Sequence, residues 1–131
     1  MSDIFLSYAR NDLHRVKPLI EALEAEGLSV WWDRKVAPGK SFEEVIDAAI
    51  ESASCVLVLW TEQSVTSDWV RTEATEGLEK GILLPVLLDE VRVPLSFRRV
   101  QAANLVGWAE DPESSHYDEL IQRIRELVPA E

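Results

Sequence analysis

Trp69 and Glu73 are the residues whose types and spacing most directly suggest chemistry. They stand four positions apart in the run Trp-Val-Arg-Thr-Glu, so on a helix they share a face and the carboxylate can lie beside the ring. An anion in that place would stabilise positive charge that develops on a sugar as a glycosidic bond breaks. The same spacing is common where Trp is a core residue and Glu is solvated, and Glu76, Glu79 and Lys80 follow on the same segment. By itself the pair leaves both interpretations open.

The segments around this pair alternate between short apolar runs and amphipathic stretches. Apolar runs bounded by turn residues predict strands, and apolar positions spaced by three or four predict helices. The predicted strands are 4–8, 28–32, 54–60, 82–88 and 104–107. The predicted helices begin after a cap at Asn11 or Asp12, after Ser41, at Ser64 and at Tyr117.

Several local signals mark the ends of these helices. Ser41 and Glu44 form the Ser-x-x-Glu pattern of a capping box, and Gly27 and Gly81 supply residues that end helices in the left-handed conformation. Pro85 is an objection inside the fourth strand, because proline removes one hydrogen-bond donor. We therefore expect that strand to be irregular at Pro85 or to lie at the edge of the sheet.

Strands that alternate with helices predict an α/β fold with a doubly wound, five-stranded parallel sheet covered by helices on both faces. The flavodoxin-like order 2-1-3-4-5 is the simplest arrangement, with the apolar run 54–60 at its centre. Ligands of such sheets bind beyond the carboxyl ends of the strands, where the winding reverses. Residues 7–10, 31–39 and 60–73 should therefore meet at one edge.

Composition restricts the class of protein. A chain of 131 residues with 47% hydrophobic residues fits one folded domain over residues 1–131, which could be the N-terminal module of a longer protein. A net charge of −11 disfavours nucleic-acid binding, and neither a secretory signal nor a membrane span is evident, so we expect a cytoplasmic domain. Cys55 lies in an apolar run and should be a core residue, and with His14 and His116 far apart no metal site is expected.

Four segments in the right order carry a resemblance to a known family. They are the run DIFLSY at 3–8, the loop 33–39, the helix start Ser67-Asp68-Trp69 and the apolar run 82–88. Together they resemble the TIR domain family, in particular its bacterial members. Members of this family either act as adaptors through TIR to TIR contacts or cleave NAD at the bond between nicotinamide and ribose.

The resemblance implies that Glu73 is the catalytic residue, since enzymatic members carry a catalytic Glu in this segment. One carboxylate can suffice because nicotinamide in NAD is a cation that departs neutral, so that no acid need protonate it. A single anion near the ribose then addresses the main remaining barrier.

The resemblance also implies roles for two tryptophans. Trp31 matches the family position that stacks on the substrate, and Trp69 matches the wall of the pocket, although a core role is equally compatible with Trp69. Trp32 and Trp60 are expected to pack in the core.

Three further residues are candidate substrate contacts. Tyr8 and Arg10 follow the first strand at the expected ligand edge, where Arg10 could bind a diphosphate or could simply pair with Asp12. Ser67 should cap the helix that carries Glu73, and its hydroxyl could also meet the ribose.

We therefore expect an NAD+ glycohydrolase or cyclase that is activated by self-association, uses NAD+ as substrate and needs no cofactor. The alternative is a non-catalytic TIR interaction module that assembles through the loop 33–40, whose cations are Arg34, Lys35 and Lys40. No Gly-x-Gly-x-x-Gly or Gly-x-Ser-x-Gly pattern supports redox or esterase chemistry. A phosphoacceptor receiver shares this topology, but the third strand ends Leu59-Trp60-Thr61 without the acceptor Asp.

Overall fold

A five-stranded parallel sheet in the order β2-β1-β3-β4-β5 forms the centre of the computed structural model, as the sequence predicted. The structure describes residues 2–32, 38–108 and 115–128. Every neighbouring pair of strands is parallel. The strands are β1 (Ile4–Ser7), β2 (Val30–Trp31), β3 (Cys55–Trp60), β4 (Leu83–Leu87) and β5 (Ala103–Asn104).

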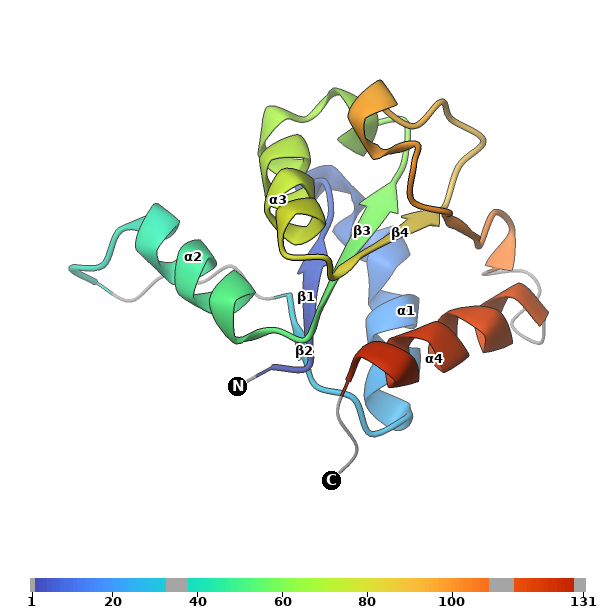
Figure 1. Ribbon diagram of the computed structural model, residues 1–131, viewed down its shortest axis with the longest axis horizontal. Coiled ribbons are helices and arrows are strands. Elements are labelled where there is room, and N and C mark those ends of the chain that lie inside the picture. Colours follow the sequence, from blue (N-terminus) through green and yellow to red (C-terminus); the bar gives the residue numbers. More distant parts are fainter. Residues whose placement is uncertain (1, 33–37, 109–114, 129–131) are drawn as a thin grey trace.

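Helices cover both faces of this sheet (Figure 1). Each face of the sheet packs in its own apolar cluster. One cluster lies between the sheet and α1 and α4, and the other lies between the sheet and α2 and α3. The edge strands β2 and β5 and the last helix differ from their predicted bounds by a few residues, which is the usual uncertainty of element ends. The helices are α1 (Leu13–Ala25), α2 (Phe42–Ser52), α3 (Asp68–Glu79) and α4 (Ser115–Leu127), with short 3₁₀ helices η1 (Arg10–Asp12), η2 (Ser64–Thr66) and η3 (Leu95–Phe97).

Strand β1 shows which side chain faces which layer. Ile4, Leu6 and Tyr8 belong to the cluster beneath α1 and α4, whereas Phe5 belongs to the cluster beneath α2 and α3. Because side chains alternate along a strand, Ser7 shares the face of Phe5. The last residue of β1 therefore points toward α3.

Serine caps begin the two helices on that face. The Ser41 hydroxyl accepts a hydrogen bond from the Glu44 amide at 3.1 Å, and the Ser67 hydroxyl accepts one from the Val70 amide at 3.3 Å. The single helix predicted from Ser64 is in fact η2, an extended residue at Ser67, and then α3. The backbone of Ser67 is extended and its hydroxyl caps the helix, so α3 begins at a defined residue.

Pro85 lies in a regular strand that is internal in the sheet order, although the side of β4 toward β5 is unpaired at Pro85 itself. The amide of Leu105 donates to the carbonyl of Leu87, so the backbone polar groups of Leu87 point toward β5. Pro85 lies two residues earlier in the strand, so its backbone nitrogen points in the same direction. Strand β5 pairs only with Val86 and Leu87. The missing donor of Pro85 therefore faces the space beyond the end of the short β5, where no ladder bond is lost.

Helix α3 approaches the sheet closely through Gly77. A Cβ atom at this position would lie 2.8 Å from Cβ of Val56 in β3, which is closer than two carbon atoms pack. Glu73 lies four residues before Gly77 on the same buried stripe. The glycine thus lets α3 lie near enough to the sheet for Glu73 to reach the strand ends.

In the part of the chain that the structure describes, no helix has the length and apolar content of a membrane span.

We predict that Gly77→Ala lowers the free energy of unfolding even though alanine is the better helix former. The clash with Val56 should cost about 1–3 kcal/mol, and improved helix propensity returns at most about 1 kcal/mol. Urea denaturation would measure the difference. The control is Glu79→Ala on the exposed face of the same helix, which should change stability by less than about 0.5 kcal/mol. Equal stabilities of the parent and Gly77→Ala would contradict the tight approach.

We also predict that Cys55 resists alkylation in the folded protein. Burial raises the pKa of the Cys55 thiol to about 12, so at pH 8 the folded chain holds roughly a thousandfold fewer thiolates than the unfolded chain. Mass spectrometry after iodoacetamide treatment should show modification in guanidinium chloride and almost none in buffer. Rapid labelling in buffer would show that β3 is exposed.

Candidate active site

A buried hydrogen bond joins the end of β1 to α3. The hydroxyl of Ser7 donates to Oε1 of Glu73 at 2.6 Å, and both side chains lie in the interior, with 0% and 2% of their surface exposed. A bond of this length to a carboxylate oxygen is characteristic of a charge-assisted contact. Glu73 is thus held at the carboxyl end of the central strands, where α/β sheets place their ligands.

The burial of Glu73 excludes the interpretation that it belongs to the solvated face of its helix. The buried residues of α3 are Val70, Glu73, Ala74 and Gly77, so a carboxylate occupies a position in an otherwise apolar or small-residue stripe. Such a side chain is costly to bury unless it is hydrogen-bonded, and Glu is almost never fully buried unless it is paired. Glu76 is partly buried, whereas Glu79 and Lys80 are exposed.

Glu73 lines a groove between α2 and α3. The groove has a volume of about 430 Å³, which is within the range of small-molecule sites. Apolar side chains from α2 and the indole of Trp69 contribute to its walls. The lining residues are Glu43, Glu44, Ile46, Asp47 and Ile50 from α2 and Trp69, Thr72, Glu73 and Glu76 from α3.

Trp69 stands at the end of this groove where both helices begin. Its ring stacks on that of Phe42, with centroids 5.4 Å apart and planes 27° apart, so the pair bridges the starts of α2 and α3. Trp69 remains 39% exposed, which is unusual for a large aromatic residue that serves only the core. The structure therefore places Trp69 at the groove wall, four residues before Glu73.

The electrostatic character of the groove is strongly negative. Five of its lining residues are carboxylic acids, and none of its lining residues is Lys or Arg. Such a surface attracts the cationic part of a ligand and repels phosphate. A ligand that carries both would place its cation here and its phosphates elsewhere.

Trp31 is not brought to this groove. Its ring stacks on Phe5 with centroids 5.0 Å apart and planes 12° apart, and it lines a separate hollow between the sheet edge and α2 together with Lys40 and Glu44. Among the hollows lined by the described residues, Trp31 and Trp69 thus line two different ones. Contact of Trp31 with a substrate stays a prediction.

Tyr8 and Arg10 also lie away from the groove. Tyr8 is in the cluster beneath α1 and α4, and its hydroxyl donates to the carbonyl of Trp32 at 2.9 Å. Arg10 is exposed in η1. The alternative that Arg10 pairs with Asp12 is not found among the described residues, where the cation near Asp12 is Arg15, at 3.8 Å. The substrate contacts proposed for Tyr8 and Arg10 stay predictions.

Ser67 has the structural role that the sequence indicated, since it caps α3. Ser7 is the site residue that sequence analysis missed. Its signal was present, because strand alternation places Ser7, and not Tyr8, on the face of α3 once Phe5 is known to face that layer. The loop residues Arg34 and Lys35 lie outside the described residues.

No group of three or more His, Cys, Asp or Glu residues in the described segments is placed to hold a metal ion. The arrangement instead offers a single buried carboxylate, oriented by a hydroxyl, in a negatively charged groove with an aromatic wall. Such a group can stabilise a developing cation without the help of a metal.

Comparisons with known proteins agree with this fold. The chain is 32% identical over 93 residues to a probable 2′ cyclic ADP-D-ribose synthase from Methanobrevibacter olleyae. The aligned region covers 66% of this chain and 27% of that protein. It is also 30% identical over 73 residues to a 2′ cyclic ADP-D-ribose synthase from Acinetobacter baumannii. This aligned region covers 54% of the chain and 27% of that protein. The chain thus spans about a quarter of these relatives.

Among solved structures, the TIR domain of a Toll-related receptor from Hydra magnipapillata superposes with a TM-score of 0.82 at 23% identity, over 95% of this chain and 99% of that one. This similarity concerns the fold alone. A family model described as TIR domain matches residues 4–121. The chain therefore belongs to the TIR domain family.

Proposed function

We propose that this domain cleaves the bond between nicotinamide and ribose in NAD+ and releases nicotinamide with ADP-ribose or a cyclic isomer of ADP-ribose. The observation that carries the proposal is the buried Glu73 carboxylate at the groove beside Trp69. The two curated relatives, named as 2′ cyclic ADP-D-ribose synthases, support the same chemistry.

The bond cleavage fits a single carboxylate. When the bond between C1′ and the pyridinium nitrogen breaks, the electron pair stays on nitrogen, so nicotinamide leaves as a neutral base and C1′ of the ribose becomes positive. The Glu73 carboxylate would stabilise this charge. Water that attacks C1′ and loses a proton gives ADP-ribose, whereas a nucleophile of the same molecule gives a cyclic isomer. No metal or other cofactor enters this balance.

The charge of the groove orients the substrate in this proposal. The pyridinium ring would enter beside Trp69 among the carboxylates, and the diphosphate would stay outside, because the lining residues offer it no cation. The ring of Trp69 would gain a cation–π contact with pyridinium. A second copy of the chain, through TIR to TIR contacts, would cover the part of the substrate outside the groove and so make activity depend on protein concentration.

We predict that Glu73→Gln abolishes NAD+ cleavage. The substitution keeps the size of the side chain but removes the negative charge, so turnover should fall by about a hundredfold or more. Nicotinamide release, followed by liquid chromatography across a range of protein concentrations, measures the effect and identifies the second product. The matched control is Glu79→Gln on the exposed face of α3, which should retain the parent rate.

Two outcomes would contradict this assignment. A folded Glu73→Gln variant with the parent rate would remove Glu73 from the chemistry. A parent protein that leaves NAD+ intact at every concentration, including self-associated samples, would favour the non-catalytic interaction module.

We further predict that Trp69→Ala raises KM for NAD+ by roughly 2–10-fold, because the lost ring contact is worth about 0.5–1.5 kcal/mol. Trp69→Phe keeps a planar ring and the stack on Phe42, and should recover most of the affinity. Initial rates over a range of NAD+ concentrations separate the two variants, with thermal unfolding as the check on folding. Equal KM values for Trp69→Ala and the parent would place the substrate away from the indole.

A further inference from the structure

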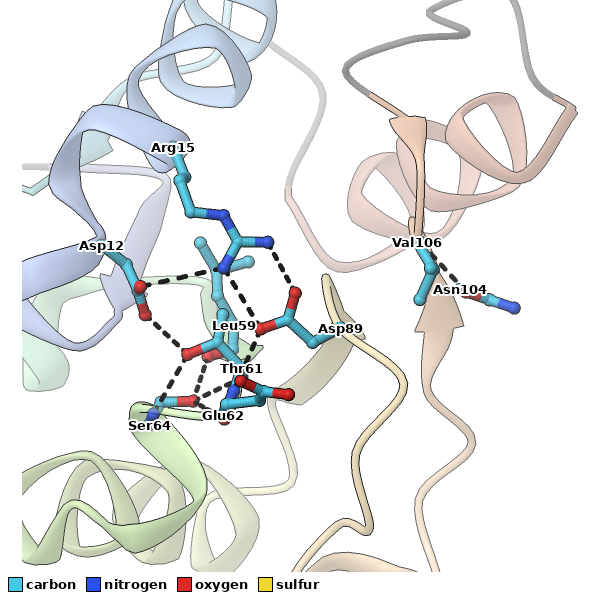
Figure 2. A network of polar contacts seen from close by, with 9 residues as sticks. All are labelled: Asp12, Arg15, Leu59, Thr61, Glu62, Ser64, Asp89, Asn104 and Val106. Atoms are coloured by element: carbon cyan, nitrogen blue, oxygen red, sulfur yellow. Dashed lines mark hydrogen bonds and ion pairs between the residues drawn. The ribbon is translucent and has the colours of Figure 1, made fainter.

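Asp12 is a second buried carboxylate, and it lies outside the groove. It ends η1, just beyond β1, and is only 4% exposed. Its Oδ2 atom accepts a hydrogen bond from the Thr61 hydroxyl at 2.6 Å, and its Oδ1 atom lies 3.8 Å from Nη1 of Arg15 (Figure 2). Burial of a carboxylate is unfavourable without such partners. The buried carboxylate of Asp12 is therefore stabilised by Thr61 and Arg15, and it in turn holds the Thr61 side chain in place.

Thr61 connects Asp12 to the start of η2. A hydroxyl has one hydrogen to donate, and that of Thr61 is committed to Asp12, while its oxygen accepts from the amide of Ser64 at 3.0 Å. The Ser64 hydroxyl in turn accepts from the Thr61 amide at 2.7 Å and donates to the Leu59 carbonyl at 2.7 Å. Thr61 and Ser64 are 1% and 0% exposed. The network thus fixes the turn between β3 and η2 in the protein interior.

This turn leads directly to the helix that carries Glu73. The Ser67 amide donates to the Ser64 carbonyl at 3.0 Å, and Ser67 is the cap of α3. On the other side, Asp12 lies five residues after Ser7. The Asp12 to Thr61 bond and the Ser7 to Glu73 bond therefore join the same two segments at two separate points. The Asp12 to Thr61 bond thus adds a buried anchor at the start of α3, beside the Ser7 to Glu73 bond and the packing of the helix against β3.

An outer arm extends the network to the end of β4. Arg15 donates to both carboxylate oxygens of Asp89, at 2.6 and 3.1 Å, and Asp89 accepts from the amide of Glu62 at 3.0 Å. These contacts raise the pKa of Arg15 and lower that of Asp89, chiefly through the hydrogen bonds between them. The Arg15 side chain is 38% exposed, so water screens this arm more than the buried bond of Asp12.

We infer that Asp12 and Thr61 are positioning residues for the proposed cleavage of NAD+: they hold the start of α3 so that Glu73 meets the ribose in the productive geometry. The inference rests on the proposed function, but it concerns residues that do not line the groove. Misplacement of a catalytic group by about 1 Å can cost about a hundredfold in rate. A loosened turn at Thr61 should therefore slow the bound reaction rather than weaken binding.

The test removes the Thr61 hydroxyl without changing the shape of the side chain. Thr61→Val should lower kcat by roughly 10–100-fold with KM within about twofold of the parent, and Thr61→Ser, which restores the hydroxyl, should recover most of kcat. The matched control is Thr66→Val in the 3₁₀ helix η2 that follows this turn, where the exposed Thr66 hydroxyl donates to the Gln63 carbonyl. This control should keep the parent kcat.

Two measurements keep the test decisive if Thr61→Val folds poorly. Asp12→Asn retains the volume and an acceptor oxygen, and should lower kcat by several-fold, less than Thr61→Val does. Amide hydrogen exchange of the free protein should become faster at residues 65–71 in Thr61→Val and Asp12→Asn, but not in Thr66→Val. This readout does not depend on substrate.

The outcomes separate the two proposals. A parent protein that does not consume NAD+ overturns the proposed function. A parent that consumes NAD+, together with folded Thr61→Val and Asp12→Asn variants that keep its kcat, overturns only the positioning role. Equal loss of kcat in Thr61→Val and Thr66→Val would also overturn it, because the effect would then not come from the buried bond.

Discussion

The rest of the site depends on the hydrogen bond that Ser7 donates to Glu73. It places a carboxylate in the interior of the molecule, where desolvation must be offset by a well-made contact, and it joins the first strand to the third long helix. Every other feature of the site follows from this requirement. The helix must lie close to the sheet, begin at a defined residue and keep one side open to a ligand.

Small and polar residues meet these conditions in different ways. Gly77 allows α3 to lie against Val56, and the cap at Ser67 sets where the helix begins. The buried bond between Asp12 and Thr61 holds the preceding turn. The stacked rings of Phe42 and Trp69 then separate the starts of α2 and α3 and leave a groove between them, while the opposite face of the sheet is filled by apolar side chains.

The charge of the acidic groove would set the orientation of the substrate in the proposed reaction. A surface rich in carboxylates stabilises a cationic ring and the positive charge that develops on the ribose, and it disfavours the phosphates of the same molecule. In the proposed function, a single domain would therefore recognise one end of such a substrate. This division is consistent with a protein that acts only when another chain completes the site.

The sequence by itself determined the alternation of strands and helices and the serine caps of α2 and α3, because periodicity and capping residues are local properties of the chain. The sheet order followed from general rules for such connections, and the Trp69 to Glu73 spacing indicated a role for Glu73 only together with the family resemblance. Only the tertiary structure decided which side chains share the groove. Ser7 reaches Glu73 across 66 positions, Asp12 lies beside Arg15 rather than Arg10, and Trp31 lines a different hollow from Trp69. These outcomes depend on which face each strand residue presents and on how closely α3 packs against β3, and a local pattern does not specify contacts between segments so far apart.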